Sequence, residues 1–139
     1  MLSIEIDQKK VGTMLALAPE KTRNALKKSL QESSAFVQKD AQKLAPLDTG
    51  ELSKSITTKV HGHHYAKIGT SLVYAAIQEY GGTIKAKNKP YLHFRTKSGN
   101  WVKVKSVVIK ARKYMEGAYK KNIKKVVKTF EKNIDAIFK

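Results

Sequence analysis

The first third of the chain changes from a strand pattern to helix patterns. Leu2, Ile4 and Ile6 alternate with polar residues, which predicts a short strand. Over 11–18 the apolar residues return at steps of three and four, which predicts a short helix that ends before Pro19. Because proline suits the first turn of a helix, we predict that a second, long helix begins there. This helix extends to Leu44, and its apolar stripe consists of Leu26, Leu30, Val37, Ala41 and Leu44, with Phe36 at the edge.

The middle of the chain shows the pattern of several strands. "SITTKV" and "YAKIGTS" are rich in β-branched or alternating residues and flank "HGHH", in which Gly62 suits a turn. "KPYLHFRTKSGNWVKVKSVVI" predicts a β-hairpin with Ser98-Gly99-Asn100 as its turn. "LVYAAIQEYGG" fits no single period and ends at a glycine pair. On the hairpin, Tyr91, His93 and Arg95 alternate with Leu92 and Phe94, and Trp101, Lys103 and Lys105 alternate with Val102 and Val104.

The last segment carries the clearest helical pattern. Its apolar residues recur at steps of three and four and fall within an arc of about 120°, while lysines occupy roughly the opposite 100°. We therefore predict an amphipathic helix with a lysine-rich back. The apolar set is Ile123, Val126, Val127, Phe130, Ile134, Ile137 and Phe138, and the lysine set is Lys121, Lys124, Lys125, Lys128 and Lys132.

Taken in order, these elements predict a single α+β domain over residues 1–139. A small antiparallel sheet is packed by a long helix in the N-terminal half and by the C-terminal amphipathic helix, and a β-hairpin projects from it. The length of 139 residues suits one modest hydrophobic core. The sequence shows no repeat, low-complexity tract or linker that would divide the chain.

Charge separates the two parts of the chain. Twenty-eight Lys and Arg residues against 11 Asp and Glu give a net charge of +17. Residues 1–84 carry a net +3, whereas residues 85–139 carry +14. Such a field favours acidic partners, such as nucleic acid, an anionic membrane or an acidic protein face. No apolar run approaches the roughly 20 residues that span a bilayer, and the N-terminus lacks signal-peptide order. We expect no membrane partner and a protein that stays where it is made.

Asp48-Thr49-Gly50 is the triplet that carries the catalytic carboxylate of aspartic proteases. Two such carboxylates share a proton in a dry, symmetric cleft. This chain has one triplet, after a helix and Pro46 rather than after an apolar strand. A turn explains more: Asp48 can cap the N–H groups that follow, Glu51 stands three residues on as in a capping box, and Gly50 lets the backbone turn. We therefore predict no protease, but a structural turn made by Asp48, Thr49, Gly50 and Glu51.

Few other residues suggest chemistry. His61, His63 and His64 cluster, but no nearby carboxylate or cysteine completes a metal site, so we favour a solvated turn. Glu79 precedes a tight turn, where a surface role is favoured over acid–base chemistry, which needs a second group. The chain has no cysteine, no nucleophile elbow and no phosphate-binding glycine loop. We predict that the protein is not an enzyme and binds neither a metal nor a cofactor.

Two basic surfaces support an alternative function as a basic nucleic-acid-binding module. On the hairpin, Tyr91, Phe94 and Trp101 interleave with basic side chains, which neutralise phosphates while rings stack on bases. The lysine-rich back of the last helix is the second surface. The opposing interpretation places Phe94 and Trp101 in the core and the lysines in solvent. The candidate contacts to DNA or to an acidic partner are Lys89, Arg95, Lys97, Lys103, Lys105, Lys121, Lys124, Lys125 and Lys128.

Three motifs in order resemble one family. "APLDTGELSKSI" resembles the "APVDTGxLxxSI" signature of phage tail-completion proteins, the head–tail joining or virion morphogenesis proteins of long-tailed bacteriophages. "YAAIQEYGG" is similar to the family's "YAxxxEYGT", and "ARKYMEGA" is similar to "ARPFLxPA", which opens the final helix. The resemblance runs from about residue 8 to the C-terminus. Lys113, Gly117 and Gly82 depart from the family pattern, which leaves the boundary of the last helix open.

The resemblance implies a structural virion protein of the phage neck. Such a protein completes the tail and joins it to the head as a ring component, often of six subunits, after assembly in the host cytoplasm. Its partners would be other copies of itself, neighbouring neck and tail-tube proteins, and the DNA that passes through the neck. We expect the hairpin and loops to make heterologous contacts that close the ring. Partly exposed aromatic residues dominate such contacts, and the candidates are Tyr74, Tyr80 and Trp101.

Overall fold

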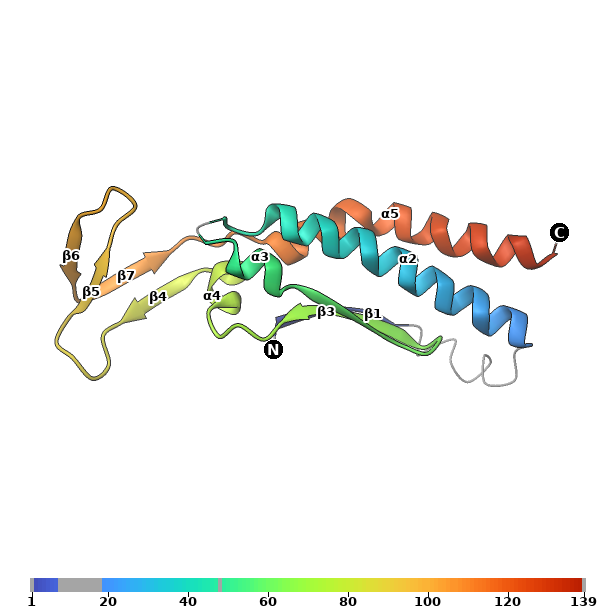
Figure 1. The fold of residues 1–139 in the computed structure, drawn as a ribbon, viewed down its shortest axis with the longest axis horizontal. Helices are drawn as coiled ribbons and strands as arrows, with labels where there is room; N and C mark the ends of the chain where they lie inside the picture. The colour runs from blue at the N-terminus through green and yellow to red at the C-terminus, as the bar shows by residue number, and fades with distance from the viewer. Residues whose placement is uncertain (1, 8–18, 48, 139) are drawn as a thin grey trace.

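The computed structural model describes residues 2–7, 19–47 and 49–138 (Figure 1). The helix predicted over 11–18 lies outside the described residues, and so does Asp48. Within the described part the predicted α+β arrangement is confirmed. It has a small antiparallel sheet, a long helix, a C-terminal helix and a projecting hairpin.

A three-stranded antiparallel sheet, in the order β1-β3-β2, is formed by β1 (Leu2–Asp7), β2 (Thr57–His61) and β3 (Tyr65–Thr70). Ile4 lies opposite Ile68, and Val60 lies opposite Ala66, so apolar residues pair across the strands. Gly62 adopts a φ of 58° in the turn between β2 and β3, a conformation that glycine accepts at little cost. All three strands lie where the alternation of the sequence predicted them.

Helix α2 (Glu20–Leu44) lies across one face of this sheet (Figure 1). Val37 and Ala41 from its apolar stripe are fully buried and share a core cluster with Ile68 of β3. Burying an aliphatic side chain of this size contributes about 1.5–3 kcal/mol, so this stripe holds the helix on the sheet. The predicted stripe is confirmed except at its end, where Leu44 is 48% exposed.

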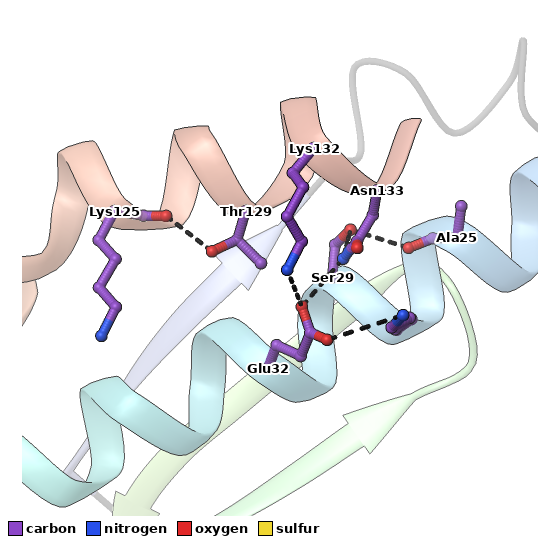
Figure 2. Close-up of polar contacts among 8 residues, drawn as sticks. Ala25, Ser29, Glu32, Lys125, Thr129, Lys132 and Asn133 are labelled. Carbon is purple, nitrogen blue, oxygen red and sulfur yellow. Dashed lines mark hydrogen bonds and ion pairs between the residues drawn. The ribbon is translucent and has the colours of Figure 1, made fainter. Parts of the chain in front are cut away.

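Helix α5 (Tyr114–Asp135) runs antiparallel to α2 and lies along it (Figure 1). Asn122 Nδ2 donates a hydrogen bond to Asp40 Oδ2 at 2.7 Å, and Asn133 Nδ2 donates one to Ser29 Oγ at 3.0 Å. The second contact is drawn in Figure 2. The two asparagines are eleven positions apart, and so are their partners on α2. Eleven residues make about three helical turns, so both contacts fit one antiparallel register and a slip of one turn would break both.

The most buried face of α5 coincides only in part with the face on which its apolar residues gather. The buried residues include two asparagines, whereas Ile123 and Val127 are 43% and 53% exposed. Phe138, in the 3₁₀ turn Ala136–Phe138 that follows, is 81% exposed. The amphipathic helix is confirmed, but its apolar stripe is only half-buried at Val126, Phe130, Ile134 and Ile137, and the rest of the stripe remains on the surface. The buried residues of α5 are Tyr114, Met115, Ala118, Asn122 and Asn133.

Residues 82–109 form a projecting arm (Figure 1). The predicted hairpin is confirmed at its outer end, where Trp101 pairs with Arg95. Its second strand breaks at Lys105, and the following residues pair with a strand before the hairpin, so the arm consists of two ribbons in series. The inner ribbon is β4 (Gly82–Lys85) with β7 (Ser106–Ile109), and the outer ribbon is β5 (Leu92–Arg95) with β6 (Trp101–Val104).

Two short helices stand at the base of the arm: α3 (Glu51–Ser55) and α4 (Ala75–Tyr80). The segment "LVYAAIQEYGG", which fits no single period, thus contains α4 and leads into β4. None of the described helices combines the length and the apolar character needed to cross a bilayer.

Candidate functional site

The arm is a basic surface without counter-charges of its own. It contains seven Lys and Arg residues and no Asp or Glu. Ile84, Leu92, Phe94 and Val107 line an apolar hollow of about 330 Å³ on it, and Ile84 and Phe94 are each 38% exposed. A two-stranded ribbon is at best marginally stable alone in water. The arm therefore has the features of a surface that a partner covers.

The outer ribbon separates its side chains onto two faces. Trp101 is 66% exposed, and its ring centre lies 4.8 Å from that of His93. Lys103 Nζ lies 4.8 Å from the centre of the Tyr91 ring. Trp101 is thus a surface residue in contact with the His93 ring, and the interpretation that places it in the core is wrong. One face presents Leu92, Phe94, Val102 and Val104, and the other presents His93, Arg95, Trp101 and Lys103.

Glu79 joins the base of the arm to α5. Its side chain is 2% exposed, Oε2 accepts a hydrogen bond from Met115 N at 2.9 Å, and Oε1 accepts one from Glu116 N at 3.0 Å. These N–H groups lie in the first turn of α5, so the carboxylate caps the helix and opposes its dipole. The Tyr114 hydroxyl donates to Ala75 O at 3.1 Å, and burial raises the pKa of Tyr114 to about 12. The expected surface role of Glu79 is wrong.

Gly81, just before the arm, lets the backbone pass close to residues 109–111, where the chain leaves the arm. Its φ is 73°, and a Cβ there would lie 2.7 Å from Ala111 N and 2.8 Å from Ile109 O. Such contacts with backbone atoms leave no room for a side chain. Lys113 N donates to Glu79 O at 3.1 Å, and Lys113 itself has a φ of 48°. Proline cannot adopt this φ, so this start of α5 requires a residue other than proline at position 113.

Residues 49–52 of the "DTGEL" stretch lie on the other side of the same junction. Gly50, with a φ of 75°, is the N-cap residue of α3, and Thr49 Oγ1 accepts a hydrogen bond from Glu51 N at 3.3 Å. Asp48, the expected capping residue, lies outside the described residues, so the capping box stays a prediction. Glu51 Oε2 accepts a hydrogen bond from the Tyr74 hydroxyl at 3.0 Å. Burial, followed by this carboxylate, raises the pKa of Tyr74.

A hollow of about 390 Å³ opens beside β1 at this junction, and we call it the β1 hollow. Its lining includes Ile4 and Glu5 of β1, Tyr80 at the end of α4, and Glu116 and Tyr119 of α5. Tyr80 is 69% exposed and Tyr119 is 37% exposed. Since β1 is an edge strand, its outer backbone groups have no partner strand among the described residues. Two of the candidate interface residues, Tyr74 and Tyr80, thus lie at the base of the arm, and Trp101 lies on its outer ribbon.

The candidate basic contacts form two separate surfaces. All nine side chains are exposed, five of them on the arm and four on α5. On the arm, Arg95 Nε donates to Gly99 O at 2.8 Å. On α5, Lys121 Nζ lies 3.4 Å from the carboxylate of Asp40, and Lys125 Nζ lies over the Phe36 ring at 4.3 Å. Part of the basic charge of α5 is therefore engaged within the chain.

The histidine cluster forms contacts between rings. The His61 ring stacks on Tyr65 with 4.5 Å between centres, and the His63 and His64 rings lie 4.1 Å apart. Burial lowers the pKa of His63, and His64 adds to this effect. Across residues 2–7, 19–47 and 49–138, no three His, Cys, Asp or Glu side chains gather as metal ligands. The predicted turn is present between β2 and β3.

Comparison with protein families identifies the class of this molecule. A family model described as "Bacteriophage HK97-gp10, putative tail-component" matches residues 9–81, which is more than half of the chain. The chain is a bacteriophage tail component, and it belongs to the HK97-gp10-like family. A search of curated proteins found no match, and neither did a search of solved structures. The matched range contains the "DTGEL" motif and "YAAIQEYGG" up to Gly81, whereas the whole arm and all of α5 lie beyond it.

Proposed function

We propose that this tail component acts at the phage neck, where it completes the tail and joins it to the head as one subunit of a ring. The observation that carries the proposal is the arm. It is exposed, basic and partly apolar, and it consists of ribbons that need a partner for stability. A projecting element of this kind suits head-to-tail contacts between identical subunits, which close into a ring.

The neighbouring proteins in this proposal are acidic on the surfaces that meet the chain. The basic charge lies on the outside of both the arm and α5, where it can contact an acidic ring above or below, or DNA in the channel. The ring would belong to the virion, and its subunits would assemble in the host cytoplasm. The proposed role is structural, in keeping with a family described as a tail component rather than as an enzyme.

Native mass spectrometry of the purified chain, alone and with tail-tube protein, tests the proposal. A discrete ring in either sample supports it. A chain that stays monomeric in both samples and binds duplex DNA, with an affinity that falls by several decades as salt rises, would favour a nucleic-acid-binding module instead.

A further inference from the structure

We propose that the outer ribbon of one copy docks into the β1 hollow of a second copy. This inference rests on the proposed ring and names the two surfaces that would form its repeated contact. The basic-aromatic face of the outer ribbon carries Arg95, Trp101 and Lys103. The β1 hollow presents the exposed carboxylate of Glu5, two exposed tyrosines and a strand edge that has no partner strand among the described residues.

Charge favours this pairing. The chain has 11 acidic side chains, and three of them, Glu5, Glu79 and Glu116, line the β1 hollow. Glu79 is occupied by the first turn of α5, and Glu116 lies 2.6 Å from Lys120 Nζ. Glu5 is exposed and forms no ion pair within the described part of the chain. In a molecule of net charge +17, an arm without acidic residues meets repulsion on most surfaces, so this hollow is a favoured contact.

The chemistry of the side chains also agrees. Interface hot spots are rich in Trp, Tyr and Arg, and Trp101, at 66% exposed, is more exposed than Tyr91 or Phe94 of the arm. The β1 hollow offers the exposed rings of Tyr80 and Tyr119, and the apolar residue Ile4 of β1 also lines it. The free edge of β1 can accept backbone hydrogen bonds from an added strand, which is a recurrent way to bind extended segments.

The arm points away from the hollow of its own chain. In Figure 1 the outer ribbon lies at the far end of the molecule from β1, beyond the inner ribbon. The same chain therefore cannot fill its own hollow in this conformation, and a second copy supplies the occupant. Because each copy has one arm and one hollow, the contact repeats from head to tail and closes a ring when the rotation permits.

Disulfide trapping tests the contact directly, because the chain contains no cysteine. The full chain with Glu5→Cys and Lys103→Cys is oxidised and analysed by non-reducing electrophoresis. We expect a ladder of cross-linked species that ends at the ring size. A mixture of the Glu5→Cys chain with the Lys103→Cys chain should give cross-linked dimers and nothing larger. The control replaces Glu5→Cys with Lys59→Cys, an exposed residue on β2 at the opposite edge of the sheet, and should give no ladder.

Charge reversal provides a second measurement. Glu5→Lys should weaken association by roughly tenfold or more, since it places like charges together, and Lys103→Glu in the same chain should restore it. If native mass spectrometry shows a ring but the cysteine pair does not cross-link, the arm-to-hollow contact is overturned and the proposed ring stands. A cross-link that stops at the dimer in the double-cysteine chain would overturn the ring and leave the contact. Absence of both would overturn both.

Discussion

Removal of the Glu79 carboxylate tests the junction on which the arm is built. Glu79→Ala takes the acceptors from two N–H groups, those of Met115 and Glu116, at 2.9 and 3.0 Å. Met115 is 2% exposed, so its N–H has little access to water. An unsatisfied buried donor costs about 1–3 kcal/mol, and loss of a helix cap costs about 0.5–2 kcal/mol. Because these terms overlap, we expect the free energy of unfolding to fall by about 3 kcal/mol.

Urea denaturation followed by far-UV circular dichroism measures this change. A loss of about 3 kcal/mol also lowers Tm by roughly 10 °C in a domain of this size. The matched control is Glu51→Ala, which removes one hydrogen bond to Tyr74 at an exposed site and should cost no more than about 0.5 kcal/mol. If Glu79→Ala costs less than about 1 kcal/mol, or no more than the control, the capping role is refuted.

Three further predictions follow from the two helices. Because burial raises the pKa of Tyr114 to about 12, its neutral form stabilises the fold fully below pH of about 10, and this contribution is lost as the pH rises through 12. Tyr114→Phe should therefore remove one late step from the tyrosine absorbance titration. The hydrogen bond from Asn122 and the charge of Lys121 lower the pKa of Asp40, so its contribution is complete above pH of about 4 and is lost below. Asp40→Asn should flatten the acid limb of a stability profile measured by urea denaturation. Val127→Ser on the exposed stripe should change the unfolding free energy by about 0.5 kcal/mol or less, whereas Leu30→Ala, at a fully buried position, should cost about 2–5 kcal/mol in the same assay.

The elements that the sequence predicted correctly are those set by local patterns. Alternation located β1, β2 and β3, and Ser98-Gly99-Asn100 located the turn of the outer ribbon. Helical spacing predicted the bounds of α2 closely and predicted most of the length of α5. In each case, side chains a few residues apart carry the signal, so one chain segment is enough to read it.

The features that the sequence missed depend on partners far along the chain. Glu79 is buried because the start of α5, 36 residues away, needs its carboxylate. Asn133 is buried against Ser29, 104 residues away, and an asparagine on a helix normally predicts an exposed position. The break at Lys105 arises because the residues after it pair with β4 rather than with β5. The spacing of hydrophobic residues within one segment carries no information about such long-range contacts.

The same reasoning explains the apolar stripe of α5. Ile123 and Val127 belong to the strongest helical pattern in the sequence, and yet they remain exposed. Periodicity shows that a face is apolar but not what covers it. In a protein that belongs to a family of tail components, the covering surface can come from another molecule, and a pattern in one chain cannot separate the two cases.

The position of the chain in purified phage particles tests the central claim most directly. Cryo-electron microscopy of such particles, with the fold docked into the density, would locate the chain and count its copies. The proposal predicts a closed ring of copies between the tail tube and the head, with each arm in contact with the neighbouring copy. Density for this fold elsewhere in the particle, or copies that do not touch one another, would contradict it.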